Sequence, residues 1–180
     1  MRLATFASPA VLAVCAAAFA VEPPSPAVAP SDRNPAENAE IARVIDASIG
    51  WARTKDRALL ESVLAHDPEF FIFHPGADDT VIGWNAFLPL FDVFMNPAFK
   101  ATGHEIRDLR INRSRSGEVA WFSAILDDCG EWQGKPGCWN DTRWTGVLER
   151  RDGRWQIVQM HFSFGTPPRK PPATATPPAM

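Results

Sequence analysis

One stretch near the carboxyl end of the chain concentrates residues whose side chains could do chemistry. It runs from Asp127 to Phe164 and reads DDCGEWQGKPGCWNDTRWTGVLERRDGRWQIVQMHFSF. It holds two cysteines, four tryptophans, the cation Arg143 among apolar neighbours, and His161. Thiols can form a disulfide, a guanidinium can pair with a carboxylate, and an imidazole can exchange protons near neutral pH. This composition fits a catalytic site, a binding pocket, or an aromatic core with a disulfide.

The two cysteines of this stretch, Cys129 and Cys138, are predicted to form a disulfide. An even pair in an exported chain favours this pairing, and closing so short a loop contributes about 2–3 kcal/mol in the chain-entropy model. Two free thiols are the alternative. No metal site is expected, because no cysteine or histidine pair stands nearby at ligand spacing.

The first 20 residues, MRLATFASPAVLAVCAAAFA, indicate export. Arg2 precedes a short apolar run that ends in Ala18-Phe19-Ala20, which is typical of a signal peptide over residues 1–20. An uncleaved anchor is the alternative, although the run is shorter than the roughly 20 residues of a membrane span. Lipid attachment at Cys15 would require a small residue where Val14 stands. We expect a periplasmic or secreted protein with no membrane segment after cleavage.

Residues 21–36 and 166–180 are rich in Pro and Ala, and we predict a disordered linker and a disordered tail. One domain is expected over residues 37–165, a size typical of a single domain. The chain has 18 basic and 21 acidic residues and a net charge of −3. This mildly acidic balance does not favour nucleic acid as a partner.

A further histidine, His74, ends the β-prone run PEFFIF just before Pro75-Gly76. By alternation with Phe70 and Ile72 it should point inward at one end of a sheet. There it could act as a general base or contact a ligand. A strand-end residue that caps backbone groups is the alternative.

The elements that must position these residues are three helices and a set of strands. Helical spacing predicts a long helix from residue 37 to about 54, a short one over Arg57–Leu64, and a third in GWNAFLPLFDVFMN. Strands are expected in PEFFIF and in HEIRDLRINRS, EVAWFSAILDDC, NDTRWTGVLERR and RWQIVQMHFSF, with Asp152-Gly153 as a hairpin turn. This order predicts an α+β fold with helices packed on one face of an antiparallel sheet.

Two hairpins set an expected register, with Cys129 facing Cys138 and Arg151 facing Arg154. Carried along the strands without interruption, this register predicts two apolar faces. The first holds Trp121, Ser123, Ile125, Asp127, Asn140, Thr142, Trp144, Leu148, Trp155, Ile157, Gln159, His161 and Ser163. The second holds Ala120, Phe122, Ala124, Leu126, Trp139, Arg143, Thr145, Val147, Val158, Met160, Phe162 and Phe164. Because both faces need cover, we expect a homodimer through the outer sheet face.

The element order, GWNAF at the third helix, and the ending TRWTGVLERRDGRWQIVQMHFSF resemble the SnoaL-like branch of the nuclear transport factor 2-like (NTF2-like) superfamily. The resemblance covers about residues 37–165. It implies a cone, in which a bent antiparallel sheet wraps around a long N-terminal helix, often with a pocket in its mouth and often dimeric. The superfamily includes isomerases, cyclases, dehydratases and non-enzymatic modules, so the fold alone does not give a function.

Comparison with the ketosteroid isomerases of that superfamily places pocket-lining positions at Val158, Met160 and Phe162, which selects the second face as the interior. The carboxylic acid of those enzymes would fall near Thr145, their base near Ile72 or His74, and their tyrosine near Ser48. This chain contains no tyrosine, so the isomerase residues are not reproduced.

On this interpretation Arg143 lies in the interior, where a buried cation requires a partner. A ligand carboxylate is one partner; the alternatives are an internal ion pair with Asp127, Asp128 or Asp141, or a side chain that reaches the mouth. The other expected ligand contacts are Thr145, Trp51, Trp84, Trp139, Met160 and Phe162, although each tryptophan could equally be core.

His161, Ser163 and Asp127 fall together on the first face and mimic a nucleophilic triad. Ser163 stands only two residues from His161 on the same strand, without an elbow or oxyanion loop, so we favour a polar interface network. The leading hypothesis is an exported domain that binds a small, partly apolar ligand in the cone without a cofactor, with an acidic ligand as one option. An acid/base enzyme of isomerase, cyclase or dehydratase type with His74 as base, and a non-enzymatic dimerisation or protein-binding module, are the alternatives.

Overall fold

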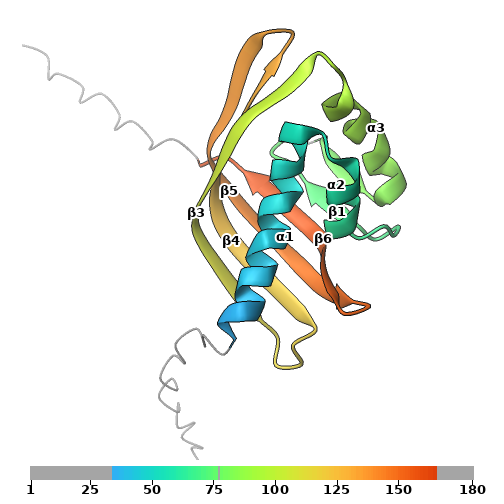
Figure 1. Cartoon of the computed structure of the whole chain (residues 1–180), viewed down its shortest axis with the longest axis vertical. Coiled ribbons are helices and arrows are strands. Elements are labelled where there is room, and N and C mark those ends of the chain that lie inside the picture. Colours follow the sequence, from blue (N-terminus) through green and yellow to red (C-terminus); the bar gives the residue numbers. More distant parts are fainter. Residues whose placement is uncertain (1–33, 77, 166–180) are drawn as a thin grey trace, which may run out of the picture. The chain divides into compact units, whose positions relative to one another are not determined.

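The computed structural model describes residues 34–76 and 78–165. This part of the chain forms three helices and one six-stranded sheet, arranged as in Figure 1. The predicted signal peptide with Cys15, most of the predicted linker, and the tail lie outside the described residues. Within the described part, no helix is both long enough and apolar enough to cross a membrane. The elements are α1 (Pro35–Thr54), α2 (Arg57–Val63), β1 (Phe71–Phe73), β2 (Thr80–Ile82), α3 (Trp84–Met95), β3 (Phe99–Arg113), β4 (Val119–Trp132), β5 (Lys135–Arg151) and β6 (Arg154–Ser163).

Helix α1 begins at Pro35, two residues before the predicted start of the long helix at residue 37. The side chain of Asn34 caps it by accepting a hydrogen bond of 3.2 Å from the backbone N–H of Glu37. Pro35 fits the first turn because a proline there needs no N–H donor. The helix ends at Lys55, whose left-handed backbone closes the last turn.

The sheet is mixed rather than purely antiparallel. Its strand order is β2-β1-β6-β5-β4-β3, and β1 pairs parallel with β6. The sequence did not predict strand β2, which forms a short antiparallel pair with β1. A parallel pair needs a long connection between its strands, and here four strands and helix α3 separate β1 from β6 along the chain.

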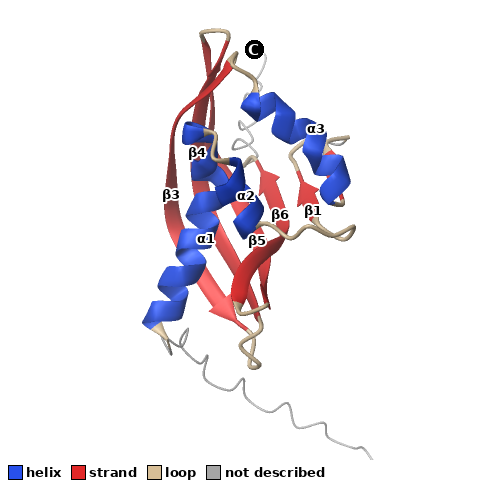
Figure 2. Ribbon diagram, turned by 45° about the vertical axis from the view of Figure 1, so that its right-hand side comes forward, coloured by secondary structure: helices blue, strands red, loops and turns tan. Residues whose placement is uncertain are grey.

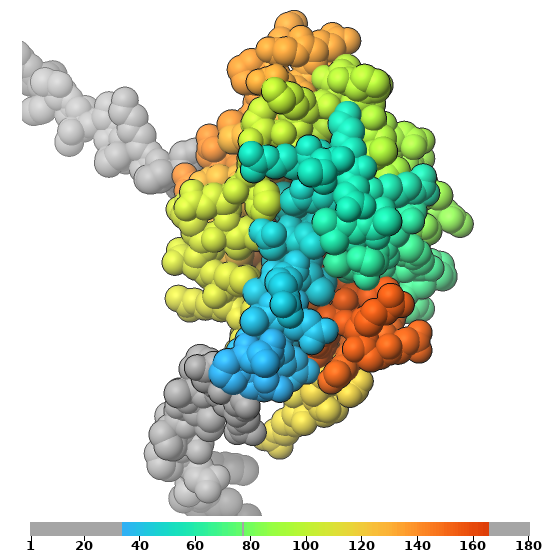
Figure 3. Space-filling view, in the orientation of Figure 1, coloured from blue at the N-terminus to red at the C-terminus, as the bar shows by residue number. Residues whose placement is uncertain are grey.

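The three helices cover one face of the bent sheet, as Figures 1 and 2 show. In the space-filling view of Figure 3 they occupy most of the face in view, with strand β3 along one edge. Ile41, Ile45 and Trp51 on α1 are buried against the sheet. The sheet does not close into a barrel, and the predicted α+β cone around the long helix is confirmed.

The predicted hairpin pairs Cys129–Cys138 and Arg151–Arg154 are confirmed, but the register between them is interrupted by two β-bulges. In the first, Asn140 and Asp141 on β5 stand opposite Asp127 alone on β4. In the second, Val158 is the extra residue on β6. Each extra residue reverses the faces of the side chains beyond it.

The reversal corrects the predicted faces of strand β5. Arg143 and Thr145 lie on the outer face and are exposed, so their predicted place in the interior is wrong. Thr142 and Trp144 lie on the inner face instead and are fully buried. They pair with Leu126 and Ala124 on β4. On β6 the second bulge turns Trp155 and Ile157 inward, while Met160 and Phe162 are buried as predicted.

Candidate functional site

The candidate site lies beside the long hairpin formed by β4 and β5. Gln133 and Gly134 both have positive φ angles, 51° and 76°, which is the backbone of a two-residue turn of the type I′ family. Cys129 and Cys138, four residues from this turn on each strand, are directly opposite each other and joined by a disulfide. The disulfide therefore joins the two strands near the closed end of the hairpin.

A cavity of about 560 Å³ opens between this hairpin, the end of α3 and the end of β1. This volume falls within the roughly 300–1,000 Å³ of small-molecule sites. The hairpin supplies most of the wall, and single residues from other elements complete it. The lining residues are Ile49, His74, Phe94, Phe99, Leu126, Asp128, Cys129, Gly130, Glu131, Trp132, Lys135, Pro136, Gly137, Cys138, Trp139 and Phe162.

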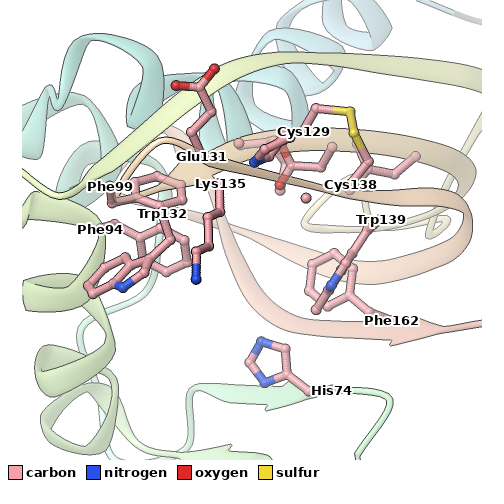
Figure 4. Close-up of a pocket in the computed structure, with 16 residues that line it drawn as sticks. His74, Phe94, Phe99, Cys129, Glu131, Trp132, Lys135, Cys138, Trp139 and Phe162 are labelled. Atoms are coloured by element: carbon pink, nitrogen blue, oxygen red, sulfur yellow. A yellow bond between two sulfur atoms is a disulfide. The ribbon is translucent and has the colours of Figure 1, made fainter.

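Aromatic rings form two opposite walls of the cavity, as Figure 4 shows. On one side Phe94 and Phe99 meet edge to face with ring centroids 5.2 Å apart, and Trp132 lies beside them. On the other side Trp139 meets Phe162 at 6.0 Å. Trp132 and Trp139 remain 42% and 39% exposed, so large apolar surfaces face the open space. Such walls suit planar or apolar ligands.

His74 lies at the mouth, as predicted, and its ring stacks on Phe162 with centroids 5.8 Å apart. Its Nδ1 is 2.8 Å from the backbone oxygen of Asp79. A carbonyl oxygen only accepts hydrogen bonds, so Nδ1 carries the proton and Nε2 of the neutral ring is left as an acceptor. The strand-end contact therefore fixes the orientation of the imidazole ring at the cavity.

Asp128 is an acidic residue of the cavity wall whose pKa is raised by burial. It is half-buried on the inner face of β4, two residues after the fully buried Leu126. Burial raises the pKa of this carboxyl, against opposing effects of His104 and of a hydrogen bond from the backbone N–H of Cys129. A carboxyl with a raised pKa can donate a proton as well as accept one.

Lys135 supplies a positive charge. Its ammonium group points into the space between the aromatic walls, whereas the carboxylate of Glu131 points away (Figure 4). Within the described ranges, no ion pair involves Lys135. Its charge is therefore available to an anionic group inside the cavity.

Three of the predicted site residues, His74, Trp139 and Phe162, line this cavity. Trp51 instead stacks on Phe91 within the core, and Met160 is also core. Trp84 stacks on His66 with centroids 3.9 Å apart, away from this cavity. Arg143 and Thr145 lie on the opposite side of the sheet.

His161 also lies on the outer face, paired with Thr145 and packed against Phe73 at 5.2 Å. Thr142, which the uninterrupted register placed beside it, is inside. Among the described residues no group of three or more His, Cys, Asp and Glu is arranged to hold a metal ion.

Sequence reasoning missed Asp128 and Lys135 as site residues. Alternation from Leu126 would have placed Asp128 inward, because no bulge interrupts β4 between them on the β3 side. Lys135 directly follows the two turn residues, so alternation along the strands did not predict on which face its side chain lies.

Comparisons with known proteins agree with this architecture. The family model of the SnoaL-like domain matches residues 41–167. No curated protein matches the chain in sequence. An NTF2-like protein of unknown function from Pseudomonas putida is similar in structure, with a TM-score of 0.57 and 17% identity, over 76% of this chain and 92% of its own.

Two other solved structures carry enzyme names. A candidate scytalone dehydratase from Novosphingobium aromaticivorans has a TM-score of 0.61 and 13% identity, over 70% of this chain and 82% of its own. A candidate ketosteroid isomerase from Shewanella frigidimarina has a TM-score of 0.53 and 20% identity, over 67% of this chain and 92% of its own. At these identities the likeness establishes the fold alone.

Proposed function

The chain belongs to the SnoaL-like domain family, and we propose that it binds a small, partly apolar, acidic ligand in the cavity beside the β4–β5 hairpin. The observation that carries this proposal is the ammonium group of Lys135 between two aromatic walls, with no ion-pair partner among the residues that the structure describes. The rings contact the apolar body of the ligand, and Lys135 takes the anchoring role that was predicted for Arg143.

Two further polar groups that line the cavity orient the bound ligand. Asp128 and the Nε2 atom of His74 can each exchange a hydrogen bond with a hydroxyl or carbonyl group of the ligand. The ligand is thus expected to carry its acidic group near Lys135 and a second polar group toward Asp128.

Binding can be tested by thermal shift and calorimetry with a library of small carboxylic acids and their methyl esters. We expect acids to bind more tightly than their esters, and Lys135→Met to remove that preference. Arg143→Met is the matched control, because Arg143 is exposed on the other face and its loss should change nothing. Equal effects of the two substitutions, or no binding of any acid, would contradict the proposal.

A second candidate function is acid/base catalysis, which the raised pKa of Asp128 favours. Asp128 would transfer a proton to or from the bound molecule, and His74 would act as the second group through Nε2. The enzyme names carried by two structurally similar proteins fit this class of reaction.

Deuterium exchange provides the test. The protein is incubated in D₂O with a panel of small ketones and hydroxyketones, and exchange at carbon is followed by NMR. We expect exchange that Asp128→Asn and His74→Asn each suppress and that Arg143→Met leaves intact. Exchange that survives both substitutions would exclude these residues as the acid and base.

Export and self-association remain part of this proposal. The disulfide suits an oxidising compartment such as the periplasm or the outside of the cell. The outer sheet face exposes Phe73, Ile82 and Trp121 at 44%, 65% and 45%, and a homodimer would cover such apolar side chains. Light scattering that gives a monomer at micromolar concentration would contradict the dimer. The open cavity argues against a purely structural module.

A further inference from the structure

One histidine, His104, lies beside the cavity but outside its lining. His104 on β3 is the direct partner of Asp128 on β4. Side chains of directly opposed residues in antiparallel strands lie on one face with Cβ atoms roughly 4.5–5.5 Å apart. His104 therefore stands next to the carboxyl that the cavity partly buries.

The far side of the imidazole is held by helix α1. Its Nε2 atom is 2.9 Å from Oδ1 of Asp46. The ring also packs where α1 has no side chain, since a Cβ atom at Gly50 would lie 3.1 Å from its Cε1 atom. The side chain of His104 is only 18% exposed, whereas that of Asp46 is 64% exposed.

Three titratable groups thus form a line from solvent to cavity, Asp46, His104 and Asp128. Asp46 from α1 and Asp128 from β4 are the charged groups that face the imidazole from the elements packed against it. Glu105 and Asp127 share a shallow surface cleft with His104, but alternation along β3 and β4 directs their carboxylates to the outer face.

We propose that His104 is a positioning residue, which Asp46 holds in place and which sets whether Asp128 presents a carboxylate or a carboxylic acid to the cavity. A protonated imidazole stabilises the carboxylate by its charge, and loss of that charge leaves only the hydrogen bond from the backbone N–H of Cys129 to oppose the effect of burial. The chemistry of the cavity is thereby controlled from the contact between α1 and β3. The proposal rests on the ligand-binding role of the cavity, but the titration itself requires no ligand.

The titration of Asp128 tests this directly. The protein is labelled with ¹³C at the aspartate carboxyl groups, and Asp128→Asn identifies the signal. We expect His104→Gln, which keeps a hydrogen-bond donor but loses the charge, to shift the titration midpoint of Asp128 upward. Asp46→Asn should shift it in the same direction by less, because the imidazole remains but is no longer held.

His161→Gln is the matched control, since His161 lies on the outer face of β6 and should leave the midpoint unchanged. Dispersed amide spectra confirm that each variant is folded, and the exposed position of Asp46 keeps its variant available if His104→Gln does not fold. An unchanged or lowered midpoint in His104→Gln, or in Asp46→Asn if that variant alone folds, would overturn the proposal. Failure of all acids to bind, with the midpoint shifted as expected, would instead contradict only the proposed ligand function.

Discussion

Asp127 and Asp128 are neighbours in the sequence, yet they belong to two regions with opposite chemistry. Asp127 lies on the outer face at the first bulge, where it accepts a hydrogen bond of 2.7 Å from the backbone N–H of Asp141 and pairs with Arg107 at 2.9 Å. These contacts lower the pKa of its carboxyl, the backbone hydrogen bond most, against a smaller opposing effect of desolvation. Burial raises the pKa of Asp128 on the inner face.

The contrast between Asp127 and Asp128 shows that the two faces of strand β4 have different roles, one structural and one at the cavity. Arg107 also pairs with Asp141 at 2.8 Å, so the outer cluster joins the bulged part of β5 to β3 and β4. The backbone of Asp141 has a positive φ of 52°, and this cluster holds it there. The outer region thus fixes the bend of the sheet, and the inner region presents reactive groups to the cavity beyond it.

Replacing one tryptophan on each face gives the largest expected contrast. Trp144 is fully buried on the inner face, whereas Trp121 is 45% exposed on the outer face. We expect Trp144→Ala to lower the free energy of unfolding by about 3–5 kcal/mol and Trp121→Ala to change it by less than about 1 kcal/mol. Chemical denaturation measures both.

Equal losses for the two variants would contradict the assignment of faces after the bulge. A large loss for Trp121→Ala that grows with protein concentration would have a different meaning, because it would show that a second copy covers the outer face. Denaturation at two concentrations tenfold apart separates these results.

The disulfide gives the next effect in size. The double variant Cys129→Ser and Cys138→Ser should lose about 2–3 kcal/mol of unfolding free energy, because the open chain regains loop entropy. Amide hydrogen exchange should quicken in the hairpin beyond residue 129 and stay unchanged at the Asp152–Gly153 turn. Reduced wild-type protein is the control and should match the double variant; unchanged exchange in the hairpin would show that the disulfide does not maintain the cavity wall.

The order of the elements other than strand β2, and the ends of both hairpins, could be predicted from the sequence because they depend on local signals. Helical spacing, the turn at Asp152-Gly153 and the cysteine pair were sufficient. The prediction that Arg143 lies in the interior was wrong because simple alternation assumes an uninterrupted register. One extra residue in a strand reverses the face of every side chain beyond it. The pair Asn140-Asp141 was a usable signal, since both residue types tolerate left-handed backbone. Val158 offered no comparable signal.

The candidate site was harder to predict than the fold because its members come from distant segments. His74 could be placed by alternation within one short strand, and Trp139 because it lies next to the disulfide. The neighbours of Asp128 are His104, 24 residues earlier in the numbering, and helix α1. Only the register of β3 against β4 brings them together.

The smallest expected effects are those of Asp127→Asn and Asp128→Asn on the free energy of unfolding. They test the contrast between the two carboxyl groups most directly, because the two effects should change with pH in opposite directions. The folded-state pKa of Asp127 is lowered, so its stabilising contribution is present above the unfolded value of about 3.9 and is lost as pH falls through the folded value. Asp127→Asn should therefore be less stable than wild type at neutral pH, and the difference should disappear in acid.

Asp128 should behave in the opposite way. Its folded-state pKa is raised, so its contribution is fully present below about pH 3.9 and is lost as pH rises through the folded value. The unfolded chain releases the proton first, which means that the folded protein pays for a buried negative charge at neutral pH. Asp128→Asn, which is uncharged at every pH, should consequently gain stability relative to wild type as pH rises. Denaturation of both asparagine variants between pH 3 and pH 8 would measure these slopes; slopes of the same sign would show that the two carboxyl groups do not lie in opposite environments.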